Sequence, residues 1–75
     1  MKIKVTRVYD RDVEIEVVIV NAKSLVAGVA KLNDMTTKDL TKRIRLENWF
    51  GGCWYLEGEK IMFDTDVGFE TYVEE

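Results

Sequence analysis

The chain has no histidine, no proline and only one cysteine among its 75 residues. Without an imidazole base, neither Ser24 nor Cys53 has the partner that nucleophilic catalysis requires. A single cysteine cannot form an intrachain disulfide, and a structural zinc site needs four Cys or His ligands. These absences predict a protein that is not an enzyme, with no catalytic residues, no metal ligands and no cofactor.

The sequence also lacks both glycine-rich phosphate-binding patterns, G-x-x-x-x-G-K-[ST] and G-x-G-x-x-G. Asp64, Asp66 and Glu75 imitate part of a calcium loop, but Phe69 stands where that loop requires glycine. We therefore interpret this segment as a turn between strands. Glycines 51, 52 and 58 are interpreted in the same way.

Long hydrophobic runs are missing as well. The longest, VVIV at 17–20 and LVAGVA at 25–30, are far shorter than the roughly 20 residues that cross a bilayer. The first ten residues, MKIKVTRVYD, alternate charged and apolar side chains, unlike a signal peptide. We expect a cytoplasmic protein with one small domain, residues 1–75. Because so short a chain buries only a modest core, we also expect a homodimer.

Alternating residues predict two strands, 2–9 and 13–20, around Asp10-Arg11-Asp12. A three-residue loop sets Val5 opposite Val17, whereas a two-residue loop would set Val5 opposite Glu16, so the three-residue loop is preferred. The outer face of this hairpin then carries lysines 2 and 4 with glutamates 14 and 16.

A helix is expected next, with Asn21 as its N-cap and a buried stripe made by Ala22, Leu25, Val29 and Leu32. Gly28 lies near this stripe, where a missing side chain lets the helix approach the sheet. Residues 36–50 fit either a helix or a strand: Thr36 and Asp39 imitate a capping box, but the apolar residues line up better on a strand. We favour a strand over 40–47.

The segment CWYLEGEKIMF predicts a hairpin with a Gly58-Glu59 turn that pairs Leu56 with Ile61 and Trp54 with Phe63. A last strand is expected over 69–73. The expected fold class is α+β, an antiparallel sheet with one helix packed on a face, in the order ββ-α-βββ.

Charge divides the chain into two unlike parts. Residues 1–45 carry ten Lys or Arg and six Asp or Glu, a balance of +4, whereas residues 46–75 carry one Lys and eight Asp or Glu, a balance of −7. Carboxylates at alternate strand positions recur about every 6.6 to 6.8 Å, which resembles a row of backbone phosphates. An acidic face could thus occupy the nucleic-acid groove of another protein, although acidic surfaces often only keep a protein soluble. The candidate partner-binding residues are Glu14, Glu16, Glu70, Tyr72, Glu74 and the aromatic pair Trp49 and Phe50.

Two alternatives use other features. Lys38, Lys42, Arg43 and Arg45, followed by nearby aromatic residues, could bind nucleic acid directly, since cations follow phosphates and aromatic rings stack on bases. The negative net charge of −3 opposes binding to a polyanion. The chain could also be a structural subunit of a larger complex.

In size, acidity and the lack of His and Pro, with the helix NAKSLVAGVAKL placed before an RIRLEN…CWYLEGEKI hairpin, the chain resembles small accessory proteins encoded by bacteriophages. Some of these are anti-CRISPR or other host-takeover inhibitors that imitate DNA. The resemblance covers residues 13–64 as a pattern and transfers no functional residue. It implies a protein that binds and blocks a nucleic-acid-binding protein of the host.

Overall fold

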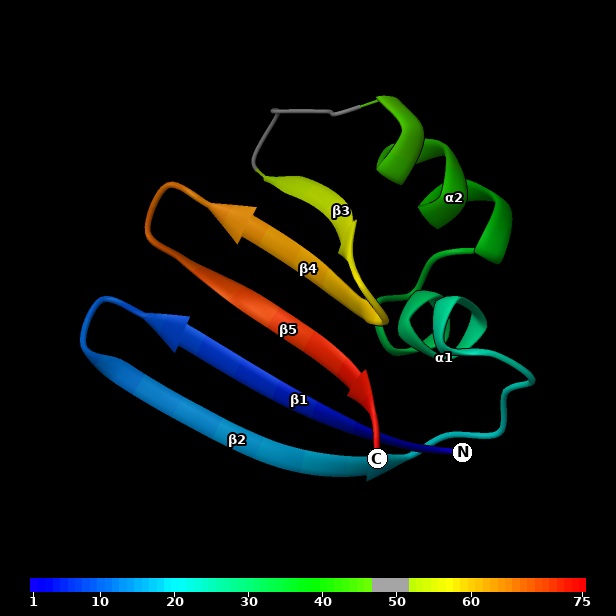
Figure 1. Cartoon of the computed structure of the whole chain (residues 1–75), viewed down its shortest axis with the longest axis horizontal. Helices are drawn as coiled ribbons and strands as arrows, with labels where there is room; N and C mark the ends of the chain where they lie inside the picture. Colours follow the sequence, from blue (N-terminus) through cyan, green and yellow to red (C-terminus); the bar gives the residue numbers. More distant parts are fainter. Residues whose placement is uncertain (47–51) are drawn as a thin grey trace.

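The computed structural model describes residues 1–46 and 52–75, which form an α+β fold with a five-stranded antiparallel sheet and two helices (Figure 1). The order along the chain is ββ-αα-βββ. The elements are β1 (Lys2–Tyr9), β2 (Asp12–Ile19), α1 (Leu25–Leu32), α2 (Thr37–Leu46), β3 (Cys53–Glu57), β4 (Lys60–Thr65) and β5 (Gly68–Glu74).

The strands lie side by side in the order β2-β1-β5-β4-β3, so the last strand of the chain enters the sheet beside the first. Every neighbouring pair is antiparallel. The β3–β4 hairpin has the predicted register, with Trp54 opposite Phe63 and Leu56 opposite Ile61. Gly58 makes the turn at φ +60°, a left-handed conformation that suits glycine.

The predicted register of the first hairpin is wrong. The structure pairs Tyr9 with Asp12 across a two-residue turn, and Val5 therefore lies opposite Glu16 instead of Val17. Asp10 adopts a left-handed φ of 54°, which aspartate tolerates better than most residues, and its N–H donates to the Val67 carbonyl at 3.1 Å. This bond joins the β1–β2 turn to the neighbouring β4–β5 turn and stabilises the shorter loop.

The first helix begins three residues later than predicted, because Ser24 and not Asn21 is its N-cap. The Ser24 Oγ accepts from the Ala27 N–H at 3.1 Å, which satisfies one free donor of the first turn. The prediction for Gly28 is confirmed. A Cβ at this position would lie 2.6 Å from Ile3 Cδ1, so any other residue would require the Ile3 side chain to shift.

The strand expected over 40–47 is also wrong, since residues 40–46 belong to α2; residue 47 lies outside the described residues. The Thr36 Oγ1 accepts from the Asp39 N–H at 3.1 Å, so the capping contact noted in the sequence does form. Leu40 is fully buried and Ile44, one helical turn on, packs against the same core, whereas Leu46 is 65% exposed. The strand interpretation had counted Leu46 among the buried residues, which hid the helical spacing.

The core lies between the helices and one face of the sheet. It contains the aromatic pair Trp54 and Phe63, whose ring centroids are 4.4 Å apart. Residues buried in this layer are Ile3, Val5, Val20, Val29, Ala30, Leu40, Trp54, Ile61 and Tyr72.

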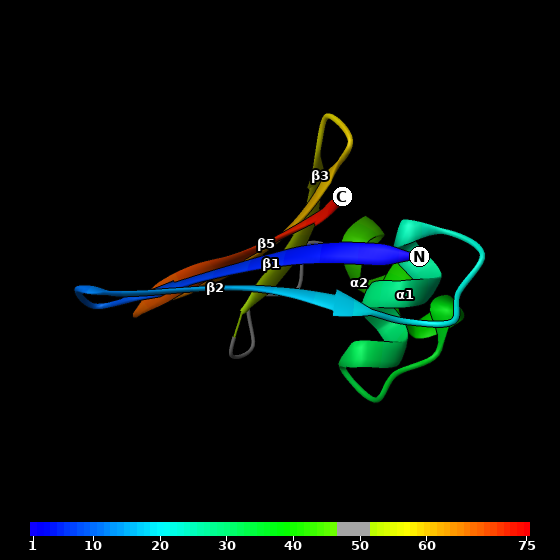
Figure 2. The same cartoon turned by 90° about the horizontal axis from the view of Figure 1, so that it is seen from below.

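The two helices cover only one end of the sheet, and the β1–β2 hairpin extends well beyond them (Figure 2). We call the side that bears Ile3, Val5 and Tyr72 the helix-side face, and the opposite side, which bears Lys4 and Phe69, the open face. Among residues 1–46 and 52–75, no helix is long and apolar enough to cross a membrane.

Replacing Leu40 with Ala should lower the free energy of unfolding by about 2 to 5 kcal/mol, because it leaves a cavity under α2. Replacing Leu46 with Ala should change it by less than about 0.5 kcal/mol, since that side chain is largely in solvent. Urea denaturation followed by circular dichroism measures both. Equal losses from the two variants would contradict the helical packing described for this segment.

Candidate functional site: the acidic helix-side face

The carboxylates predicted to bind a partner lie on one face of the sheet. Glu14 is opposite Arg7 on β1, and Arg7 is in turn opposite Glu70 on β5. Glu16 and Glu74 belong to the same face by strand alternation. The hairpin register expected from the sequence had put Glu14 and Glu16 on the outer face, and the two-residue turn moves them to the helix side.

The two faces of the sheet differ in charge. The strand residues of the helix-side face carry five carboxylates and one guanidinium, a balance of −4, whereas those of the open face carry three lysines and two carboxylates, a balance of +1. The helix-side charges are Asp12, Glu14, Glu16, Glu70, Glu74 and Arg7; those of the open face are Lys2, Lys4, Lys60, Glu57 and Asp64.

Glu70 is the centre of a hydrogen-bond network on this face. Its Oε2 accepts from the Tyr9 hydroxyl and its Oε1 from the Tyr72 hydroxyl, both at 2.5 Å. Arg7 Nε lies 3.5 Å from Glu70 Oε2, and Arg7 Nη1 donates to Glu16 Oε1 at 2.7 Å. One arginine therefore links a carboxylate on β2 to a carboxylate on β5 across β1.

This network alters the acidity of the two tyrosines. Burial is the larger cause and the hydrogen bond to the Glu70 carboxylate the next, and together they raise the pKa of Tyr9 to about 12. The same two causes, in the same order, raise the pKa of Tyr72. The raised pKa of each tyrosine keeps its hydroxyl protonated, and donating to Glu70, at pH values near 10 where an ordinary tyrosine ionises.

The candidate residues differ in their access to a partner. Tyr72 is 1% exposed and belongs to the core, and the Glu70 side chain is only 14% exposed. Asp12, Glu14 and Glu16 are all exposed on β2, at positions that the helices do not cover. These three residues are called the β2 carboxylate row below.

Other candidate residues lie elsewhere. Glu74 is exposed at the end of β5, near the helices. Trp49 and Phe50, the predicted aromatic anchors, lie outside the described residues. Arg7, Tyr9 and Asp12 were not selected from the sequence, because only the two-residue turn brings the β2 carboxylates to the face of β1 that bears Arg7 and Tyr9.

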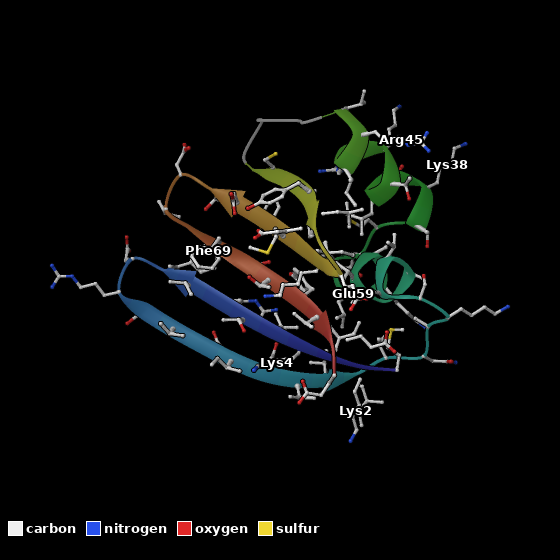
Figure 3. The ribbon with its side chains drawn as sticks, viewed as in Figure 1. Lys2, Lys4, Lys38, Arg45, Glu59 and Phe69 are labelled. Atoms are coloured by element: carbon white, nitrogen blue, oxygen red, sulfur yellow. The ribbon has the colours of Figure 1, made fainter. Side chains whose placement is uncertain are left out.

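A basic surface lies on α2, at the other end of the molecule from the β1–β2 turn (Figure 1). Lys38, Lys42 and Arg45 are spaced i, i+4 and i+7 and are exposed, and they line a shallow groove of about 320 Å³ with Thr41 and Leu46. Lys38 and Arg45 extend from the helix away from the sheet (Figure 3). The chain therefore separates the β2 carboxylate row from a basic helix.

Among the described residues, no three or more His, Cys, Asp or Glu side chains are grouped so that they could hold a metal ion. Comparisons with protein-family models, with curated proteins and with solved structures find no match to this chain.

Spectrophotometric titration of tyrosinate tests the Glu70 network. Replacing Glu70 with Gln should lower the pKa of Tyr9 from about 12 toward the ordinary 10.0, because the neutral amide no longer opposes formation of tyrosinate. Glu14→Gln is the matched control, since that side chain is exposed and should leave the titration unchanged.

Stability should also fall as the pH rises from 10 to about 12, the interval between the unfolded and folded pKa of Tyr9. Within this interval the unfolded chain releases its tyrosine proton and the folded chain holds it, so deprotonation favours unfolding. The role of the carboxylate would be contradicted if the free energy of unfolding of Glu70→Gln depended on pH in the same way as that of the unmodified protein.

Proposed function

We propose that this chain is a non-enzymatic binding protein, encoded by a phage or mobile element, that blocks a nucleic-acid-binding protein of the host. The β2 carboxylate row would enter the cationic groove that otherwise holds nucleic acid. The observation that carries the proposal is the balance of −4 on the helix-side face of the sheet, where three of the five carboxylates lie on β2, in the hairpin that extends beyond the helices. The absence of histidine and of a phosphate loop from the sequence supports binding over catalysis.

The spacing within the row suits this role. Alternate residues on a strand lie about 6.6 to 6.8 Å apart, so Asp12, Glu14 and Glu16 present three anions at regular intervals. Ion pairs within 4.0 Å in the described chain involve Glu16 and Glu70 but neither Asp12 nor Glu14. Asp12 and Glu14 are therefore the residues of the row best placed to meet cations of a partner.

The hydrogen bonds and ion pairs around Glu70 and Arg7 would hold the β2 carboxylate row in a fixed position. Arg7 bonds to Glu16 and lies beside Glu70, so it links β2 to β5 across β1 at the last carboxylate of the row. A rigid row loses less conformational entropy on binding than a flexible acidic tail would. Electrostatic attraction would also accelerate the encounter with a cationic groove, and added salt would reduce that acceleration.

The test is capture of proteins from a nuclease-treated bacterial lysate on the immobilised chain, followed by elution with duplex DNA. The captured proteins should be released by DNA and enriched in nucleic-acid-binding proteins. The double variant Asp12→Lys, Glu14→Lys should capture at least about tenfold less, because it reverses two charges of the row.

Glu57→Lys, Glu59→Lys is the control, since it changes the net charge equally at the β3–β4 turn, the end of the sheet away from the row. It should capture as much as the unmodified chain. Equal capture by both double variants, or capture that duplex DNA does not release, would refute the role of the row.

Direct nucleic-acid binding through α2 is the second candidate function, favoured by the alignment of Lys38, Lys42 and Arg45 on one exposed stripe. It predicts that duplex DNA or RNA is retarded in a gel shift at low salt, with affinity that falls steeply as salt rises. Lys42→Glu should abolish the shift, whereas Lys23→Glu, outside the stripe, should reduce it only slightly. No retardation at low salt would eliminate this candidate.

A further inference from the structure

Strand β2 has its polar and apolar residues in an unusual arrangement for an edge strand. Where one face of an antiparallel sheet is covered, apolar residues usually point to the covered side and polar residues to solvent. Here the carboxylate row points to the helix side, while four β-branched aliphatic residues occupy the open face. They are 51 to 78% exposed. These residues are Val13, Ile15, Val17 and Ile19.

The apolar area continues across the neighbouring strands. Val8 lies opposite Val13 on the open face, and Phe69, which is 39% exposed, lies opposite Val8. No described helix covers this part of the sheet, and Phe69 and Lys4 mark it in Figure 3. We call the aliphatic residues of β2 together with Val8 and Phe69 the apolar patch.

We infer that the apolar patch is the interface of a homodimer in which two copies of this chain pack open face against open face. Such a sheet-on-sheet arrangement places side chains from both inner faces in a layer about 10 Å thick. It buries the exposed aliphatic residues of β2, and it leaves the helix-side faces of both copies on the outside. The inference rests on the open face alone, so it stands or falls separately from the function proposed for the acidic row.

Charge opposes this packing less than it opposes packing of the helix-side faces. On the three strands that carry the patch, the open face has two lysines, Lys2 and Lys4, and no carboxylate, a balance of +2 for each copy. Stacking two helix-side faces would instead bring together two surfaces of −4 each. Lys4 borders the patch, where its aliphatic stem can lie on apolar surface while the ammonium group reaches the rim.

Charge also opposes the other way in which two edge strands associate. If β2 paired with β2 of a second copy to extend the sheet, the carboxylate rows would lie beside each other, because antiparallel partners at the same level share a face. Six carboxylates, three from each copy, would then line one side of the new strand pair. Charged residues on an edge strand are a common protection against such pairing. The edge of β2 is protected in this way, and its open face is not.

The available area is that of a modest interface. The three strands that carry the patch, β2, β1 and β5, have eight, eight and seven residues; at about 4.8 Å between strands and about 3.3 Å per residue they give a flat projection of about 360 Å². Standard interfaces bury about 800 Å² of accessible surface per partner, and the relief of the side chains makes accessible area larger than its projection. A reversible dimer with a dissociation constant in the micromolar range is therefore expected.

Sedimentation equilibrium over a range of concentrations tests the inference. At about 100 μM the mass should approach twice the 8.7 kDa of one chain, and it should fall toward one chain on dilution. Ile15→Asp should raise the dissociation constant at least about 30-fold, the effect of an interface hot spot, while circular dichroism remains that of the folded chain.

The matched control is Leu56→Asp. Leu56 is 55% exposed, close to the 59% of Ile15, but it lies on the helix-side face of β3, so this variant should dimerise as the unmodified chain does. If Ile15→Asp unfolds, Ile15→Thr keeps a β-branched side chain and should still weaken the dimer. A single-chain mass at every concentration, or equal weakening by Leu56→Asp and Ile15→Asp, would overturn the inference.

Hydrogen exchange distinguishes packing of faces from pairing of edges. Face-to-face packing leaves the outward backbone amides of β2 unpaired, so their exchange should be as fast in the dimer as in the diluted chain. Protection of alternate β2 amides on dimerisation would show pairing of edge strands and would refute the face-to-face interface.

Discussion

The pairing of Val5 with Glu16 is the constraint on which the surface of this molecule depends. A strand has a side-chain period of two, so a shift of one residue would move every side chain of β2 to the opposite face. The two-residue turn at Asp10 and Arg11 selects one of the two possibilities. It places the β2 carboxylates beside Arg7 and leaves the aliphatic residues of the same strand in solvent. The acidic row and the apolar patch are therefore two results of one register.

Glu70 shows how core and surface are connected. It precedes the buried Tyr72 by two positions on β5, lies beside Arg7 and accepts hydrogen bonds from Tyr9 and Tyr72. A carboxylate that loses most of its contact with water needs such partners, because an unpaired one would be costly to bury. The residue thus joins the core tyrosine to the charged side chains of the hairpin. It contributes to the order of the acidic face more than to its accessible charge.

Local pattern was sufficient for the elements that depend on near neighbours. The β3–β4 hairpin was predicted correctly, because Gly58 favours the turn and the residues on either side match on both faces. The close approach at Gly28 was also predicted correctly, although the helix begins at Leu25, after the Ser24 N-cap. In residues 36–50, helical propensity and strand alternation disagreed, and the prediction chose the strand. Burial of Leu40 and Ile44 against the sheet decides for the helix, and that contact joins segments distant in the sequence.

The sequence identified most residues of the candidate site but not their arrangement in space. Glu14, Glu16, Glu70 and Glu74 were recognised as alternating carboxylates, but nothing local indicates that β5 lies next to β1, and so nothing indicates that they share a face. The amino-acid sequence by itself determined the α+β class, the charge difference between its two parts and the lack of imidazole. The tertiary structure decided which side chains meet and which stay in solvent, because strand order and register are set by long-range pairing and by one turn whose length local preference left open.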